Sequence, residues 1–278
     1  VILSMEQPKY AKVLNQPGVL QRADLVATYS QNGTFRGRPN LPLTYYPLHI
    51  TPADAVLRTP LPFAKKDGFG TGVSVVAFVS NCGNAGAEQR KVYMQELMKH
   101  IKVHNYGNCL NTRQGEAEAN EVENPRVRRR VRKMRTLKRY KFYLAFENDL
   151  VQDYVSEKVY EGYLAGTIPV YRGSPVIEPF LPSGDSAINA HGMSPLELAE
   201  HLKRVAADET LYNSYMAFKK RPLSSQFTAL TRRSYVHPNV VCRICAYFQG
   251  RGDPAATHAR GENVLGDEQL RSFSAAIR

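Results

Sequence analysis

The order of apolar and polar positions changes its period within residues 141–173, and this change predicts a strand, a helix and a second strand. The run 142–146 (FYLAF) is continuously apolar and aromatic, as expected of a strand that is covered on both faces. From about Asp153 the apolar residues recur at helical spacing until Gly166, which stands where helices commonly end. Residues 167–171 then predict the next strand. Together these elements form a βαβ unit of the length that parallel strands require.

A second unit of the same kind precedes the first. Residues 73–79 predict a strand, residues from about 88 to 100 a helix, and residues 101–103 another short strand. Repeated alternation of strand and helix from 73 to 171 predicts an α/β fold with a doubly wound, Rossmann-like sheet, whose ligands lie at the carboxyl ends of the strands. The glycine-rich residues 68–72 precede a strand instead of following one, so they do not predict a nucleotide-binding loop.

Length and composition bound the domain organisation. The chain has 278 residues, of which 43% are hydrophobic and 22% charged, which suits one large or two ordinary domains. We expect a partial domain over the proline-rich residues 1–68, a main domain over 69–250 with a basic insertion at 115–140, and a flexible tail at 251–278. No apolar run is long enough to span a membrane, and no signal peptide is recognisable. Because the chain starts at Val1 and not at Met, we expect a fragment or a processed form, in which a membrane anchor or targeting segment upstream would not be visible.

One segment accounts for most of the formal net charge of +12. Residues 126–141 contain ten basic and no acidic side chains, which leaves the rest of the chain at only +2. Such a run is typical of a nucleic-acid patch, a nuclear signal or a contact with an anionic membrane. We favour a solvated insertion, helical because Val127, Val131 and Met134 recur at helical spacing. The run lacks the interleaved aromatic residues with which proteins stack nucleic-acid bases.

The four cysteines permit three disulfide connectivities. Cys242 and Cys245 form a CxxC pair, which is typical of a redox pair, half a zinc site or a small disulfide loop. Zinc is disfavoured because Cys82 and Cys109 do not form a second such pair. A thioredoxin-type site is disfavoured because the CxxC follows the α/β region. Two disulfides in an oxidising lumen are the favoured interpretation, and four reduced structural thiols are the alternative.

The stretch 142–173 has the form FYLAFEN-x5-YVSEK-x7-GTIPVYRG, and it resembles the shared motif of the family-10 fucosyltransferases. Ser156 stands where that family usually has Thr, and Asp149 where it has Ser. The likeness extends to VSNC at 79–82 with Arg90, to YGNC at 106–109 and to CRIC at 242–245. It covers about residues 73 to 250 and is greatest to the plant and protist core-α1,3 type.

The resemblance implies a GT-B fold, in which a Rossmann-like donor domain faces an acceptor domain that is only partial here. It implies an inverting glycosyltransferase that moves L-fucose from GDP-fucose to a GlcNAc hydroxyl of a glycan in α1,3 linkage. It also implies a type II membrane protein of the Golgi lumen, in which the sequon at Asn32 is a candidate glycosylation site. A basic nucleic-acid-binding protein acting through residues 126–141 and an inactive, donor-binding remnant are the alternatives.

Five residues match family positions that contact the donor. Arg90 would clamp the leaving GDP through its two-pronged guanidinium, and Lys158 would add a full positive charge in the first turn of the predicted helix. Glu157 is suited to binding sugar hydroxyls. The full set implied by the resemblance is Arg90, Asn148, Tyr154, Glu157 and Lys158.

The resemblance assigns two carboxylates, Glu6 and Glu157, to catalysis. Glu6 is the candidate base, because an inverting transfer needs a group that takes the proton of the acceptor hydroxyl while its oxygen attacks the anomeric carbon. No DxD metal motif occurs, so we expect no metal site and no required cofactor, and a divalent metal ion would at most stimulate the reaction. The expected partners are GDP-fucose and a glycan acceptor, with no nucleic acid.

Overall fold

A five-stranded parallel sheet forms the centre of the larger domain in the computed structural model. The structure describes residues 1–6, 11–16, 18–46, 56–83, 85–115, 121–235 and 240–251, so the expected tail lies outside them apart from Arg251. The strands are β5 (Val75–Ala77), β6 (Val103–Asn105), β7 (Phe142–Phe146), β8 (Ile168–Arg172) and β9 (Ile188–Asn189). Their spatial order is β6-β5-β7-β8-β9, so the direction of strand addition reverses between β5 and β7. This order is that of a doubly wound sheet, as predicted.

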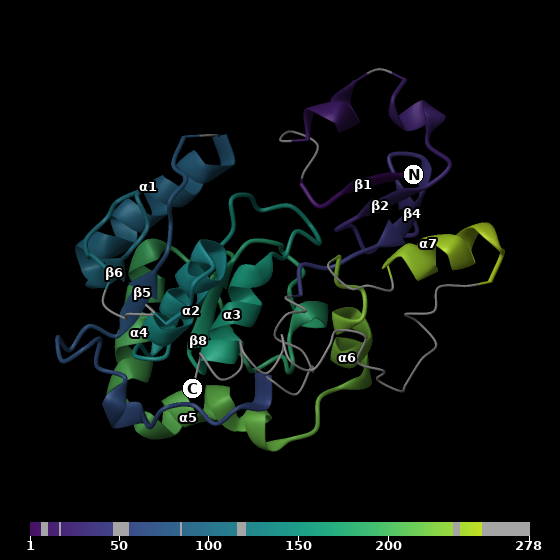
Figure 1. Ribbon diagram of the computed structural model, residues 1–278. Coiled ribbons are helices and arrows are strands. Elements are labelled where there is room, and N and C mark those ends of the chain that lie inside the picture. Colours follow the sequence, from purple (N-terminus) through teal and green to yellow (C-terminus); the bar gives the residue numbers. More distant parts are fainter. Residues whose placement is uncertain are drawn as a thin grey trace.

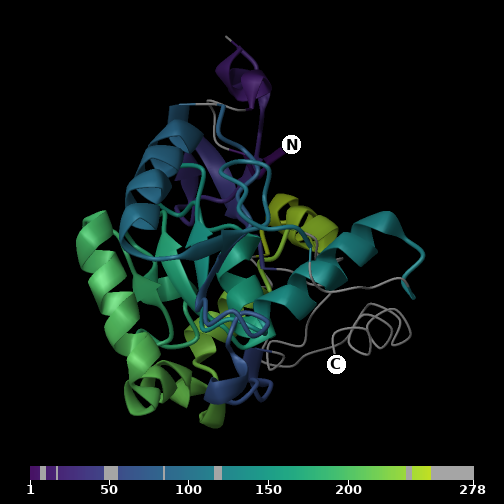
Figure 2. The same cartoon turned by 90° about the vertical axis from the view of Figure 1, so that its left-hand side faces the viewer.

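Helices cover both faces of this sheet, as Figure 2 shows most clearly. On one face lie α1 (Ala85–His100), α4 (Pro195–Ala207) and α5 (Glu209–Met216), and on the other α2 (Pro125–Leu137) and α3 (Glu157–Ala165). The strands alternate accordingly. Val75 and Ala77 face the first helix layer, whereas Val76 faces the second. Burial on both faces explains why the central strands β5 and β7 are continuous hydrophobic runs.

The basic segment of the sequence forms α2, the crossover helix between β6 and β7, and it is therefore not the insertion that we expected. Asn124 caps its first turn by accepting hydrogen bonds from two backbone N–H groups, and Pro125 occupies the first helical position. Val131 and Met134 are fully buried against the sheet, in agreement with the predicted helical spacing. The basic side chains surround these buried positions, and Lys133 lies over the rings of Phe78 and Tyr143.

A smaller sheet contains the N-terminal strands (Figure 1). Its order is β1 (Ile2–Ser4), β2 (Val26–Thr28), β4 (Arg38–Pro42) and β3 (Thr34–Phe35), with the first three parallel and β3 antiparallel. The helix α7 (Val240–Phe248), the last one in the described residues, packs against this sheet through Val240, and buried Arg243 donates a hydrogen bond to the Pro42 carbonyl at 2.8 Å. Thus α7 belongs with the N-terminal unit, although the sequence placed it in the donor domain.

Shorter elements complete the described chain. They are the 3-10 turns η1 (Lys12–Asn15), η2 (Leu20–Arg22), η5 (Phe63–Lys65), η6 (Glu178–Phe180) and η7 (Ala217–Lys220), and the helix α6 (Ser225–Thr231). Thr44 attaches the smaller unit to the end of the donor domain by two backbone hydrogen bonds. Its N–H donates to the Arg233 carbonyl, and its carbonyl accepts from the Tyr235 N–H. No helix within the described ranges has the length and apolar character needed to cross a bilayer.

Candidate functional site

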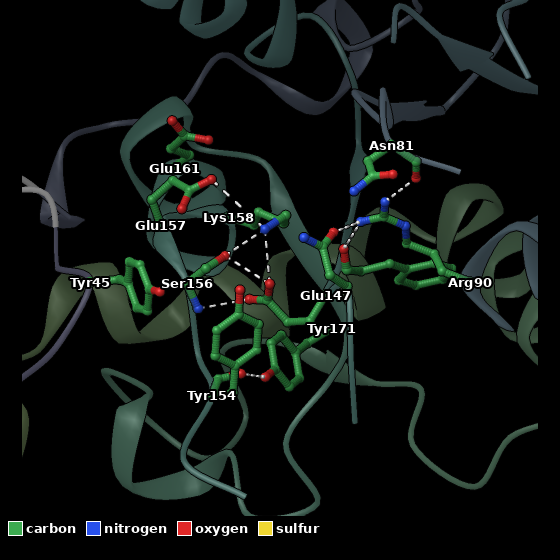
Figure 3. Close-up of polar contacts among 12 residues, drawn as sticks. Tyr45, Asn81, Arg90, Glu147, Tyr154, Ser156, Glu157, Lys158, Glu161 and Tyr171 are labelled. Carbon is green, nitrogen blue, oxygen red and sulfur yellow. Dashed lines mark hydrogen bonds and ion pairs between the residues drawn. The ribbon is translucent and has the colours of Figure 1, made fainter. Parts of the chain in front are cut away.

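Arg90, on α1, ties together the loops that follow β5 and β7 (Figure 3). Its guanidinium donates hydrogen bonds to Asn148 Oδ1 at 2.7 Å and to the Phe146 carbonyl at 3.2 Å. A third hydrogen bond, of 2.6 Å, reaches the Asn81 carbonyl beyond β5. Open α/β sheets bind ligands where the strand order reverses, which here is between β5 and β7. The predicted residues Arg90 and Asn148 therefore meet at the ligand-binding edge of this sheet.

A disulfide between Cys82 and Cys109 joins the loop after β5 to the loop after β6. Beside it, the fully buried side chain of Asn105 accepts hydrogen bonds from Val79 N at 3.0 Å and from Gly107 N at 3.2 Å. Covalent and hydrogen-bonded links thus fix the two loops relative to each other. This confirms a disulfide in the predicted set.

Cys242 and Cys245 are free thiols, so the second predicted disulfide is not formed. Both lie on α7, which is helical through the whole CxxC segment, and both side chains are exposed to solvent. Within the described residues there is no group of three or more His, Cys, Asp or Glu side chains that could hold a metal ion.

Glu147, the first residue after β7, organises the start of α3. Its carboxylate is buried and accepts three hydrogen bonds, from Ser156 N, Ser156 Oγ and Lys158 Nζ, each 2.8 Å long (Figure 3). Ser156 is the N-cap residue of α3, yet its hydroxyl is turned to Glu147 and makes no capping bond to the helix. The first N–H groups of α3 therefore receive no side-chain cap from Ser156. The positive end of the helix dipole lies at these N–H groups.

Lys158 and Glu157 form the charged surface of this helix start. Lys158 Nζ lies 3.8 Å from Glu157 Oε1, and their side chains are 18% and 41% exposed. Burial alone would lower the pKa of Lys158, but Glu147 and Glu157 outweigh it and raise that pKa, so the ammonium stays charged. Burial would likewise raise the pKa of Glu157, but the charges of Lys158 and Lys133 lower it to about 2. Both groups are thus fully ionised at neutral pH.

Tyr154 lies between the two domains and is buried. Its ring packs edge-on against Tyr29 and Tyr45, with ring centres 5.4 and 5.9 Å away. Its carbonyl accepts a hydrogen bond from Tyr171 Oη at 3.2 Å. Burial, together with the charge of Glu147, raises the pKa of Tyr154, so its hydroxyl is a proton donor at any physiological pH. The structure therefore places this predicted donor-contact residue at the domain interface.

Glu6 reaches this cluster from the opposite domain. It follows β1, is exposed, and its Oε2 lies 3.5 Å from Tyr154 Oη, at the outer limit of a hydrogen bond. The carboxyl end of the N-terminal sheet thus faces the start of α3. All six residues predicted for donor and acceptor chemistry come from the carboxyl edges of the two sheets or from the helix starts beside them.

Glu147, Asn81 and Ser156 lie inside the sequence motifs but were given no role there, although each makes a central contact of this site. The signal for Glu147 is its position, since a carboxylate that directly follows a fully apolar strand is near the sheet edge where ligands bind. Nothing in the periodicity indicates that Lys158 turns back toward that strand end. The contact depends on how α3 packs on the sheet.

Chemically, this edge of the sheet is suited to an anion. It combines the N-terminus of a nine-residue helix, a charged lysine and a buried arginine at the strand switch. The partly exposed carboxylate of Glu157 adds acceptors for hydroxyl groups at the rim. A phosphate-bearing ligand with a polyhydroxylated substituent matches these groups.

Ion pairs among the described residues involve at least four of the ten basic side chains in residues 126–141. Arg130 and Lys133 contact the buried carboxylate of Glu161 on α3, at 3.7 and 2.6 Å. Arg135 pairs with Glu121, and Arg139 pairs with Asp67. These pairs attach α2 to the domain, and they do not favour the alternative of a nucleic-acid-binding segment.

The sequence comparisons identify relatives of known class. A family model described as glycosyltransferase family 10 (fucosyltransferase), C-terminal, matches residues 71–259. The chain is 34% identical over 216 residues to the rat GDP-fucose protein O-fucosyltransferase 3, covering 76% of this chain and 44% of the relative. It is 30% identical over 236 residues to the Drosophila melanogaster alpha-(1,3)-fucosyltransferase B, covering 81% of this chain and 50% of the relative. The chain therefore spans at most about half the length of these two relatives.

The comparison of folds agrees. A solved structure described as an alpha1,3-fucosyltransferase with GDP-fucose superposes with a TM-score of 0.53 at 19% identity, covering 86% of this chain and 72% of that one. A second structure of an alpha1,3-fucosyltransferase gives a TM-score of 0.52 and also covers 86% of this chain. These matches show a shared fold and confirm the predicted GT-B architecture.

Proposed function

The chain belongs to glycosyltransferase family 10, the fucosyltransferases, and on that premise we propose that it is part of an inverting enzyme that transfers L-fucose from GDP-fucose. The observation that carries the proposal is the meeting of Lys158, Arg90 and the start of α3 at the strand switch. The carboxylate of Glu6 faces this cluster from the other domain. A donor site and an acceptor base would thus be on opposite walls of one interdomain site.

The donor's diphosphate is proposed to bind at the N-terminus of α3. The ammonium of Lys158 and the backbone N–H groups of the first turn would contact its oxygens, while Arg90 and Asn148 would limit its position on the β5 side. Glu157 would accept hydrogen bonds from fucose hydroxyls. The two cations and the helix dipole stabilise the negative charge that develops on GDP as it leaves, so the proposal requires no metal ion.

On the acceptor side, Glu6 would serve as the general base. It removes the proton of the acceptor hydroxyl while that oxygen forms a bond to the anomeric carbon of fucose, and the bond from that carbon to the phosphate oxygen breaks. GDP departs with the electron pair, and the configuration inverts. The hydroxyl of Tyr154, whose Oη lies 3.5 Å from Glu6 Oε2, is positioned to orient that carboxylate by a hydrogen bond.

Two classes of acceptor follow from the names of the relatives. The Drosophila relative's name supports α1,3 transfer, for which we propose a GlcNAc hydroxyl of a glycan as the acceptor. The rat relative's name supports transfer to an oxygen of a protein. The glycan acceptor is our first choice. We also propose a Golgi-lumenal location in a type II membrane protein, with glycosylation of Asn32, whose side chain is on the exposed turn before β3.

Donor binding is tested by measuring the melting temperature of this chain in the presence of GDP and in the presence of UDP. We expect GDP to raise the melting temperature and UDP not to, and we expect Lys158→Ala and Glu157→Ala to reduce the shift. Lys203→Ala, on α4, is a control lysine far along the chain from this site. A folded sample that GDP does not stabilise would contradict the proposal. Donor binding without fucose transfer to any glycan or protein acceptor would instead favour the inactive remnant.

A further inference from the structure

Asp153 lies in the loop between β7 and α3, and its backbone has a conformation that few residues other than glycine adopt. Its φ is 63°, in the left-handed region, and the residue is buried. Aspartate tolerates this region better than most residues, but such a conformation persists only where the surrounding structure holds it. Backbone strain of this kind is concentrated at functional sites, and the contacts of Asp153 indicate which function it serves.

The donor domain holds the backbone of Asp153 on both sides of the residue. Its N–H donates a hydrogen bond to Ser174 Oγ at 3.1 Å, in the loop after β8, and its carbonyl accepts one from Val155 N at 2.9 Å. Ser174 is itself fixed, because its own N–H donates to Tyr171 Oη at 2.8 Å. The donor domain therefore fixes the point from which the carboxylate of Asp153 extends.

The carboxylate of Asp153 contacts the opposite domain. Its Oδ2 accepts a hydrogen bond of 2.9 Å from the backbone N–H of Gln31, in the loop after β2. The side-chain amide of Gln31 joins this loop to the end of β4, since its Nε2 donates to the carbonyls of Tyr29 and Leu43, each at 2.9 Å. Its Oε1 accepts a further hydrogen bond from Arg233 Nη1 at 3.1 Å. Gln31 is thus a firmly held point of the N-terminal sheet, and Asp153 is bonded to it.

This bond lies beside the residues proposed for the acceptor reaction. Tyr154 follows Asp153 directly, and its ring packs on Tyr29 of the N-terminal unit. Burial, and next the charge of Asp153, raise the pKa of Tyr29, so that carboxylate is close to the same ring. Glu6, whose Oε2 lies 3.5 Å from Tyr154 Oη, follows β1, which pairs with β2 in the N-terminal sheet. A change in the distance between Asp153 and Gln31 would therefore also move Glu6 relative to the donor site.

We propose that Asp153 is a positioning residue, which sets the distance between the two sheets so that the carboxylate of Glu6 faces the bound donor. The inference rests on the proposed transfer of fucose. Asp153 acts through Gln31 and the strands beside it, and it takes no part in the chemical step. A hydrogen bond to an ionised carboxylate is shorter and stronger than a neutral one, which suits a contact between two firmly held loops. A displacement of about 1 Å at a reacting group can lower a rate about 100-fold, so one such contact is enough to control transfer.

Two replacements separate this contact from the backbone strain. Asp153→Asn and Asp153→Gly both accept a positive φ, but only asparagine keeps a side-chain oxygen for the Gln31 N–H. Gln152→Gly, at the exposed neighbouring position, is the matched control for added flexibility of the loop. Hydrogen exchange of the Gln31 amide should be about 10- to 150-fold faster in Asp153→Gly than in the unaltered chain. Asp153→Asn should restore most of the protection, and Gln152→Gly should keep it.

A second measurement separates positioning from a loss of structure. It follows the hydrolysis of GDP-fucose, in which water takes the place of the acceptor hydroxyl. The kcat should fall by about 100-fold in Asp153→Gly, recover in Asp153→Asn and stay unchanged in Gln152→Gly. The Kd for GDP, measured by calorimetry, should be the same in all three variants, because the diphosphate site belongs to the donor domain alone.

Three results would overturn the inference while leaving the proposed function intact. One is an Asp153→Gly variant in which the Gln31 amide exchanges as slowly as in the unaltered chain. Another is a loss of GDP affinity equal to the loss of turnover, which would show that the replacement damages the donor site itself. The third is an equal loss of turnover in Gln152→Gly, which would assign the effect to loop flexibility. An unaltered chain that binds no GDP, or that binds GDP and releases no fucose, would contradict the proposed function, and the exchange measurement would still decide whether Asp153 holds the two sheets together.

Discussion

Replacing Glu147 with glutamine should destabilise the protein far more than any other single carboxylate change at the site. Glutamine has nearly the same size and shape, so the packing around the side chain is preserved. It loses the charge that faces Lys158 Nζ at 2.8 Å, and it places an NH₂ group where a carboxylate oxygen accepted hydrogen bonds. The perturbation is therefore electrostatic, and it falls on the contact that joins the end of β7 to the start of α3.

The expected magnitude follows from burial. Breaking a buried ion pair by removing one partner costs about 3–5 kcal/mol, because the remaining charge is left unpaired. The Lys158 side chain is 18% exposed and can regain some hydration, and the glutamine oxygen can still accept the hydrogen bond from Ser156 N. We therefore expect a loss of about 2–3 kcal/mol in the free energy of unfolding.

Glu157→Gln is the matched control, because it removes the other carboxylate near the same lysine. That pair is 3.8 Å apart, and the glutamate side chain is 41% exposed, so the cost should stay below about 1 kcal/mol. The measurement is urea denaturation at pH 7 followed by far-ultraviolet circular dichroism, in which Glu147→Gln should lower the midpoint by roughly 1 M. Equal midpoints for the two variants would refute the argument that Glu147 organises this helix start.

Two further changes test other parts of the structure. Lys66 is fully buried, and burial, aided by nearby Lys219, lowers its pKa to about 7, so between pH 7 and 10 the unfolded chain binds a proton that the folded chain does not. The free energy of unfolding should therefore rise in that window by up to about 1.4 kcal/mol per pH unit. Lys66→Met should flatten this rise, as measured by denaturation at a series of pH values. An unchanged slope would count against the argument that burial lowers the pKa of Lys66. The Cys82–Cys109 disulfide spans a sequence separation of 27 residues, so the double alanine variant should lose about 3–4 kcal/mol, and a variant as stable as the oxidised protein would show that this crosslink contributes little.

Much of the donor domain could be predicted from the sequence because its signals are local. The apolar run of β7 and the helical spacing that ends at Gly166 depend only on neighbouring residues, and Gly166 indeed has a positive φ of 69° at the end of α3. The role of α2 was harder to predict. Its basic residues suggested an insertion, whereas two buried positions, Val131 and Met134, are what make it the crossover of the sheet.

The features that the sequence did not indicate are long-range. The packing of α7 on the N-terminal sheet joins residues about 200 positions apart, as in the bond from Arg243 to Pro42. The contact between Arg90 and Asn148 joins residues that follow two different strands, β5 and β7. Only the family motif indicated that these two residues belong to one site. The role of Glu147, one position before Asn148, was not predicted, because its contacts with Ser156 and Lys158 depend on how α3 packs on the sheet.

The most direct test of the central claim is a crystal structure of the chain with GDP bound. We predict that the diphosphate contacts Lys158 Nζ and the backbone N–H groups of residues 157–159, at the edge where Arg90 holds Asn148. A diphosphate bound elsewhere, with the start of α3 left without ligand contacts, would contradict this assignment of the donor site.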